Sequence, residues 1–220
     1  MGRFVSSAKL SPLPRPPRAA SIRTLTLIGV LAALAIIGRI AFLWAPNYAL
    51  TYFVVFFSGV LLGPLAGIAV GVVSMTATNL LLSGLHPVLF ANAAAMASIG
   101  AMGGLMRPIF LPQAPSRLDR AYQWVLAGAA GLMGTFLFSL LGDLFGFLLQ
   151  FMVTPEGSTI GTSALLPMLL TGLVFNLGPA LMNMVLFAVA TPALLATLRK
   201  SGHVWPGARP GIIDAETGPT

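Results

Sequence analysis

The chain has 220 residues, of which 57% are hydrophobic and only 8% are charged, and its mean hydropathy is +0.92. Soluble domains carry about 25% charged residues, so this composition excludes an ordinary soluble domain. Apolar runs near the roughly 20 residues needed to cross a bilayer recur along the chain, apolar on every face, which excludes the alternating pattern of a membrane β-barrel. The absence of cysteine excludes disulfides and thiol chemistry. We therefore predict an all-α polytopic membrane protein.

The predicted elements follow one another with short connections. An N-terminal arm, residues 1–21, is rich in proline and arginine and is expected to be disordered. Residues 22–198 form the predicted domain of six transmembrane helices, at 22–43, 49–62, 64–83, 88–106, 121–153 and 164–198. At about 1.5 Å per residue the fifth helix is too long to cross upright, so it must tilt, kink or begin in the interface. Gly178-Pro179 predicts a kink in the sixth, and the tail 199–220 is expected to be loose.

A glycine-rich stretch, residues 59–84, organises the middle of the chain. Its glycines recur every four residues, at Gly59, Gly63, Gly67 and Gly71. Proline is best tolerated in the first turn of a helix, so Gly63-Pro64 is predicted to be a tight turn between the second and third helices. The glycines after this turn predict a groove that another helix can approach closely.

The positive charges predict the orientation. Every lysine and arginine except Arg39 lies in a segment that is cytosolic if both termini are cytosolic, whereas the turns 44–48, 84–87 and 154–163 carry none. Cytoplasmic segments retain positive charge, so we predict both termini in the cytosol. The net charge of +7 is then a topology signal and does not indicate a nucleic-acid partner.

Two formally charged residues remain at membrane depth, Arg39 in the first helix and Asp143 in the fifth. Such a charge costs roughly 3 kcal/mol on insertion scales, so it normally has a partner or a function. Asn79 and Asn92 lie at a similar distance from the outer turns. Four polar residues on four helices therefore predict a solute pocket that opens to the outside, with the turn 44–48 as its lid. The alternative is an Arg39–Asp143 ion pair that only locks two helices together.

Short motifs spread over residues 24–198 carry a family resemblance. They are Gly38-Arg39, Pro46-Asn47, the G-P-x-A-G block at 63–67, Asn79 followed by Gly84, a proline-led fourth helix ending in small residues at 98–104, and Asp143-Leu144. In these motifs the chain resembles the substrate-binding S component of an energy-coupling factor (ECF) vitamin transporter.

The resemblance implies capture of a vitamin or vitamin-like solute from the outside of a bacterial inner membrane. It also implies a complex with a transmembrane coupling (T) subunit and two cytosolic ABC ATPases. The chain lacks a phosphate-cradling motif, so partners must supply the energy. Small residues at Gly29 and Ala33 are expected to contact the coupling subunit. The predicted substrate-binding residues are Arg39, Asn47, Asn79, Asn92, Asp143 and Asn176, with no cofactor or metal.

Two other classes of protein remain as alternatives. A six-span scaffold for cell-envelope assembly needs no outer pocket. An intramembrane enzyme is disfavoured, because His86 lies in an outer turn and His203 in the tail, with no H-E-x-x-H motif or paired carboxylates. We predict that the chain is not an enzyme.

Overall fold

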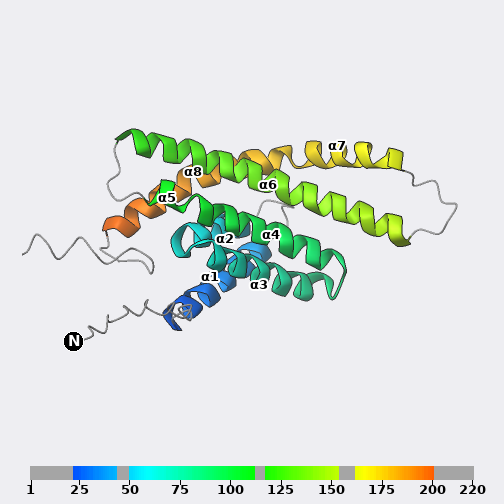
Figure 1. Cartoon of the computed structure of the whole chain (residues 1–220), viewed down its shortest axis with the longest axis horizontal. Coiled ribbons are helices and arrows are strands. Elements are labelled where there is room, and N and C mark those ends of the chain that lie inside the picture. Colours follow the sequence, from blue (N-terminus) through cyan, green and yellow to red (C-terminus); the bar gives the residue numbers. More distant parts are fainter. Residues whose placement is uncertain (1–21, 44–49, 112–116, 154–161, 201–220) are drawn as a thin grey trace, which may run out of the picture.

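The described residues of the computed structural model are 22–43, 50–111, 117–153 and 162–200 (Figure 1). Predictions for the N-terminal arm, the turn 44–48 with Asn47, and the tail beyond residue 200 fall outside them. Helices make up nearly all of this part, which contains no strand. They are α1 (Ile22–Ala41), α2 (Leu50–Leu62), α3 (Pro64–Ser83), α4 (Val88–Leu105), α5 (Arg107–Phe110), α6 (Arg117–Val153), the short 3-10 helix η1 (Thr162–Ala164), α7 (Leu165–Phe175) and α8 (Leu177–Lys200). The all-α prediction is confirmed.

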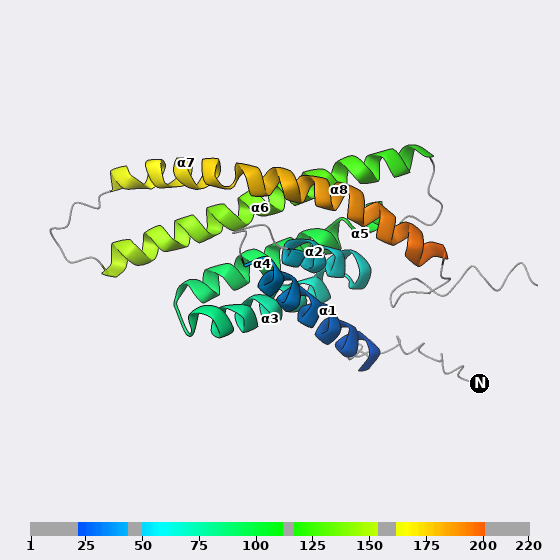
Figure 2. The ribbon, with the colours of Figure 1, turned by 180° about the vertical axis from the view of Figure 1, so that it is seen from behind.

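The helices form two groups that lie against each other. α1 to α5 make up one group, and α6 with α7 and α8 runs across it as a second layer (Figures 1 and 2). The most extensive contacts are between α3 and α4 in the first group and between α6 and α8 in the second, while α4 also packs on α6. α7 lies beside the second half of α6 and extends beyond the first group (Figure 1).

The core is built around α2. Every residue of this helix from Thr51 to Leu61 is buried, which fits a sequence that is hydrophobic on all faces. Aromatic rings join it to the second layer: the Phe56 ring centroid lies 5.1 Å from that of Phe187 on α8, and the Tyr52 ring centroid lies 5.2 Å from that of Phe138 on α6. α2 therefore holds the two groups of helices together.

Glycines allow α2, α3 and α4 to meet at backbone contact. Gly63 adopts a φ of 99° and Pro64 is the first residue of α3, so the predicted Gly63-Pro64 turn is confirmed. A Cβ added at Gly67 or Gly59 would overlap the backbone of Gly100, and one at Gly100 would overlap Gly67. The predicted groove is thus filled by α4.

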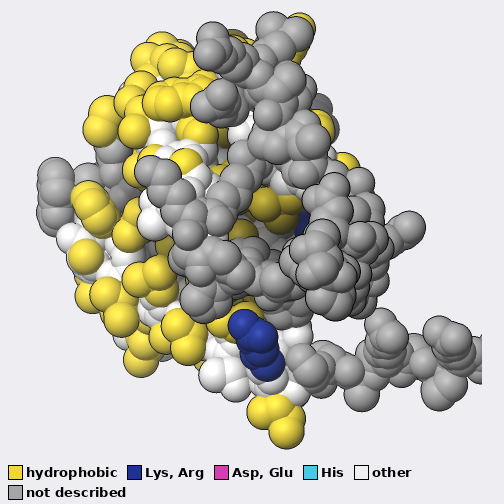
Figure 3. Space-filling model, turned by 90° about the vertical axis from the view of Figure 1, so that its left-hand side faces the viewer, with side chains coloured by type: hydrophobic (Ala, Val, Ile, Leu, Met, Phe, Trp, Pro, Cys, Tyr) yellow, Lys and Arg dark blue, Asp and Glu magenta, His cyan; other side chains and the backbone are white. Residues whose placement is uncertain are grey.

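Among the described residues, five helices are long and apolar enough to cross a membrane: α1, α3, α4, residues 121–149 of α6 and residues 177–198 of α8. This fits a multi-pass membrane protein. α2 and α7 are apolar but shorter. Large apolar side chains are exposed on most helices, and Figure 3 shows hydrophobic side chains over much of the described part of one face, as expected for contact with lipid.

Two predicted boundaries are wrong. The sixth span is not one helix, because α7 ends at Phe175 and α8 begins at Leu177. Pro179 has no N–H to donate to the Phe175 carbonyl, so the break falls just before the expected kink. The polar loop 107–120 is also shorter than predicted, since it contains α5 and the start of α6. Gln123 Nε2 donates to the Ile109 carbonyl at 3.0 Å and thereby ties α6 to α5.

Candidate functional site

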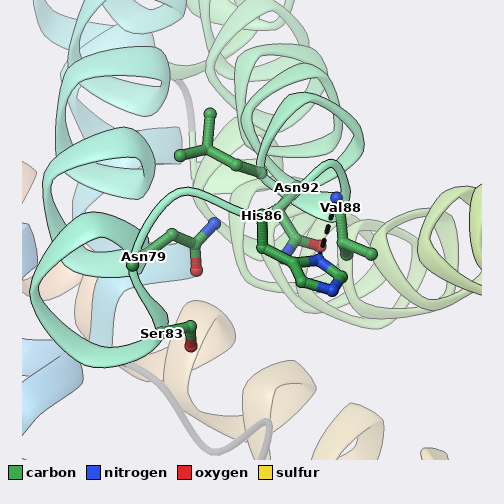
Figure 4. Close-up of a pocket in the computed structure, with 7 residues that line it drawn as sticks. Asn79, Ser83, His86, Val88 and Asn92 are labelled. Atoms are coloured by element: carbon green, nitrogen blue, oxygen red, sulfur yellow. Dashed lines mark hydrogen bonds between the residues drawn. The ribbon is translucent and has the colours of Figure 1, made fainter.

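A small pocket lies where α3 ends and α4 begins (Figure 4). Its volume is about 280 Å³, just below the range of about 300–1,000 Å³ that is usual for small-molecule sites. It is lined by Asn79, Ser83, Gly84, His86, Val88, Leu89 and Asn92. The pocket can therefore enclose a small solute or one part of a larger one.

The turn between the two helices shapes this pocket. α3 ends at Ser83, and Gly84 adopts a φ of 71°, a conformation that glycine reaches without strain. The backbone N–H of Val88 then donates to His86 Nδ1 at 3.3 Å as α4 begins. This bond holds the imidazole at the rim, where Figure 4 shows it between Asn92 and Val88.

Asn79 is the most unusual residue of the pocket. Its side chain is only 7% exposed, yet Nδ2 has no hydrogen-bond partner among the described residues. Leaving a buried donor unpaired costs about 1–3 kcal/mol. Most buried polar groups in folded proteins are paired, so an exception calls for an explanation, and a missing ligand is one.

Asn92 faces Asn79 from the first turns of α4. It also lines the pocket, and its Oδ1 lies 4.0 Å from the position that a Cβ would take on Gly142 of α6. The structure therefore brings two of the predicted site residues into one cavity and sets a small residue of α6 beside them.

Arg39 lies near this pocket but does not line it. Its Nη1 donates to Met75 Sδ at 2.9 Å, from the last turns of α1 to the middle of α3. Met75 is fully buried and stands four residues before Asn79, on the same face of α3. Arg39 is thus one helical turn along α3 from the buried amide.

Asp143 lies at a different junction, between α6 and α7. Its Oδ2 accepts a hydrogen bond from Ser139 Oγ at 3.1 Å, and the carboxylate packs against Gly172. Asn176, another predicted site residue, donates from Nδ2 to Ser139 Oγ and to the Gly172 carbonyl, both at 2.8 Å. Asp143 and Asn176 therefore belong to one polar cluster, away from the Asn79 amide.

Arg39 and Asp143 thus have separate partners. α1 packs on α2 and α3, whereas α6 packs on α8, α4 and α7. Arg39 contacts the thioether of Met75, and Asp143 accepts a hydrogen bond from the hydroxyl of Ser139. In the described ranges no ion pair joins Arg39 to Asp143.

The sequence reasoning did not place Ser83 or His86 in the site. His86 was visible as a turn residue, but its position in the pocket depends on how Gly84 turns the chain. Gly29 and Ala33, the predicted coupling contacts, lie on exposed positions of α1, and nothing stands within 4 Å of a Cβ at Gly29. Within the described residues, no group of three or more His, Cys, Asp or Glu could hold a metal ion.

Comparisons with known proteins yield no match. No protein-family model matches the sequence, no curated protein is significantly similar to it, and no solved structure is significantly similar to the fold. The function is therefore argued from the pocket and its neighbours.

Proposed function

We propose that this protein is the membrane-embedded solute-binding subunit of an ECF-type ABC importer in a bacterial cell membrane. It captures a vitamin or vitamin-like solute from outside and delivers it with a transmembrane coupling subunit and two ABC ATPases. The observation that carries the proposal is the pocket at the α3–α4 turn, in which the buried Asn79 Nδ2 has no hydrogen-bond partner from the described part of the chain. The sequence motifs that resemble S components support it.

The alternative, a scaffold of cell-envelope assembly, has less support. A purely structural helix bundle gains nothing from a buried donor without an acceptor, because the desolvation cost remains uncompensated. A solute that offers an acceptor to Asn79 Nδ2 recovers that cost each time it binds. The unpaired amide at a cavity therefore favours a binding protein.

The proposed orientation places both termini in the cytosol and the pocket on the outside. α2 and the broken pair α7–α8 complete six passes with the other long helices, and the basic residues then lie inside. Single cysteines at Asn47, Ser116 and Ser158 test this, because the chain has no native cysteine. An impermeant thiol reagent on intact cells is expected to label positions 47 and 158 and spare 116. Labelling at 116 contradicts the orientation.

Solute binding is tested by equilibrium binding of radiolabelled water-soluble vitamins to the purified protein in detergent. Asn79→Ala removes the unpaired donor and is expected to weaken binding of the recognised solute by about ten- to a hundredfold. Ser98→Ala is the matched control, since the Ser98 hydroxyl only bonds back to the Ala94 carbonyl of α4. It is expected to leave the affinity unchanged. If no vitamin binds the folded wild-type protein, the scaffold alternative is favoured.

A further inference from the structure

Two hydrogen-bond donors are available around the pocket, and acceptors such as Asn92 Oδ1 also line it. Asn79 Nδ2 is buried and unpaired among the described residues. His86 Nδ1 accepts from the Val88 N–H, so a neutral imidazole carries its proton on Nε2 and can donate from that atom. Both side chains line the same cavity (Figure 4). A solute that supplies acceptor atoms fits both donors.

Arg39 adds a positive charge, and among the described side chains no carboxylate pairs with it. A guanidinium has five N–H donors, and in the described ranges the bonded partner of Arg39 is the Met75 thioether, which is a weak acceptor. A partly buried charge at membrane depth that lacks an opposite charge is costly, so an anion brought by a ligand would be stabilising.

The α3 residue that Arg39 contacts lies one helical turn before the residue that carries the unpaired amide. Arg39 contacts α3 at Met75, and Asn79 follows four residues later on the same face, which is about 6 Å along the helix axis. Asp143, the acidic residue whose side chain the structure describes, points to α7, where it accepts from Ser139 and packs on Gly172. Its carboxylate therefore does not occupy the place of a counter-ion for Arg39.

We propose that the pocket selects a small organic anion, whose carboxylate or phosphate oxygens accept from Asn79 and His86 while Arg39 attracts the charge. This inference rests on the proposed function and specifies its substrate class. A unit charge about one helical turn away, in a medium less polar than water, favours an anion over a neutral analogue of equal size by about tenfold or more.

The test uses pairs of probes that differ in charge, and the two carboxylate pairs are also closely matched in size. The pairs are nicotinate and nicotinamide, pantothenate and panthenol, and pyridoxine 5′-phosphate and pyridoxine. Binding of each to the purified full-length protein is measured for the wild type, Arg39→Gln and Arg39→Lys. Arg23→Gln is the matched control, because it removes an arginine from the exposed first turn of the same helix. A melting curve of each variant reports whether it is folded.

The anionic member of at least one pair is expected to bind the wild type about tenfold or more tightly than its neutral analogue. Arg39→Gln is expected to abolish this preference, while Arg39→Lys and Arg23→Gln retain it. The kind of pair that shows this preference, carboxylate or phosphate, identifies the oxyanion. If the neutral member of each pair binds the wild type as tightly as the anionic member or more tightly, the anion inference is overturned while the proposed function stands. This comparison uses the wild type alone, so it remains decisive even if Arg39→Gln does not fold. If no probe and no vitamin binds, both fall.

Discussion

Gly100→Ala is expected to destabilise the protein by about 3 kcal/mol and to lower its melting temperature in detergent by about 6–12 °C. Gly100 lies at the point where α4 meets both Gly59 of α2 and Gly67 of α3. The added methyl group would overlap the Gly67 carbonyl, which is backbone and cannot rotate away. α4 must therefore move outward, and the contacts along the whole α3–α4 interface weaken with it.

Gly146→Ala is the matched control for this prediction. Gly146 also lies inside a helix, α6, but nothing stands within 4 Å of its added Cβ. Alanine is favoured over glycine in a helix by roughly 0.5–1 kcal/mol, so this variant is expected to melt at or slightly above the wild-type temperature. If Gly100→Ala melts like Gly146→Ala, the three helices are not in backbone contact.

The sequence was sufficient to place elements wherever local chemistry fixes their ends. α3 runs from Pro64 to Ser83 as predicted, because glycines with positive φ stand directly before and after it. The sixth span was harder to predict. Gly178-Pro179 indicated a disruption of the helix. Asn176 Nδ2 also donates to the Gly172 carbonyl and helps to end α7 at Phe175. A hydropathy pattern does not show this hydrogen bond between a side chain and the backbone.

The site was predicted in part for a similar reason. Depth in the membrane can be counted from the turns, and Asn79 and Asn92, which this count puts at one level, line one pocket. Depth does not reveal the direction of a side chain around its helix. The same count puts Asp143 in the outer half, but it faces Gly172 of α7, next to Asn176 and Ser139. Rotation about the helix axis separates it from Arg39, and only the packing of the helices determines that rotation.

The second large effect is expected on transport. We predict that Gly29→Leu and Ala33→Leu each lower uptake of the solute by about tenfold or more, which corresponds to about 1.4 kcal/mol of lost contact with the coupling subunit. Both residues lie on exposed positions of α1, and the space above Gly29 is open, so a large side chain does not disturb the fold. Uptake is measured in cells that contain the native partners, and solute binding is measured on the isolated subunit.

Binding by the isolated subunit is expected to stay at the wild-type level in both variants, because the α3–α4 pocket does not include this part of α1. Val30→Leu is the matched control. Val30 is already large and 60% exposed, and it lies next to Gly29 in the chain but about 100° away around the helix. A partner helix that approaches α1 closely at Gly29 and Ala33 is not hindered by leucine at position 30, so uptake is expected to be preserved. Normal uptake by Gly29→Leu and Ala33→Leu would show that this face of α1 contacts only lipid, and the coupling contact would have to lie on another helix.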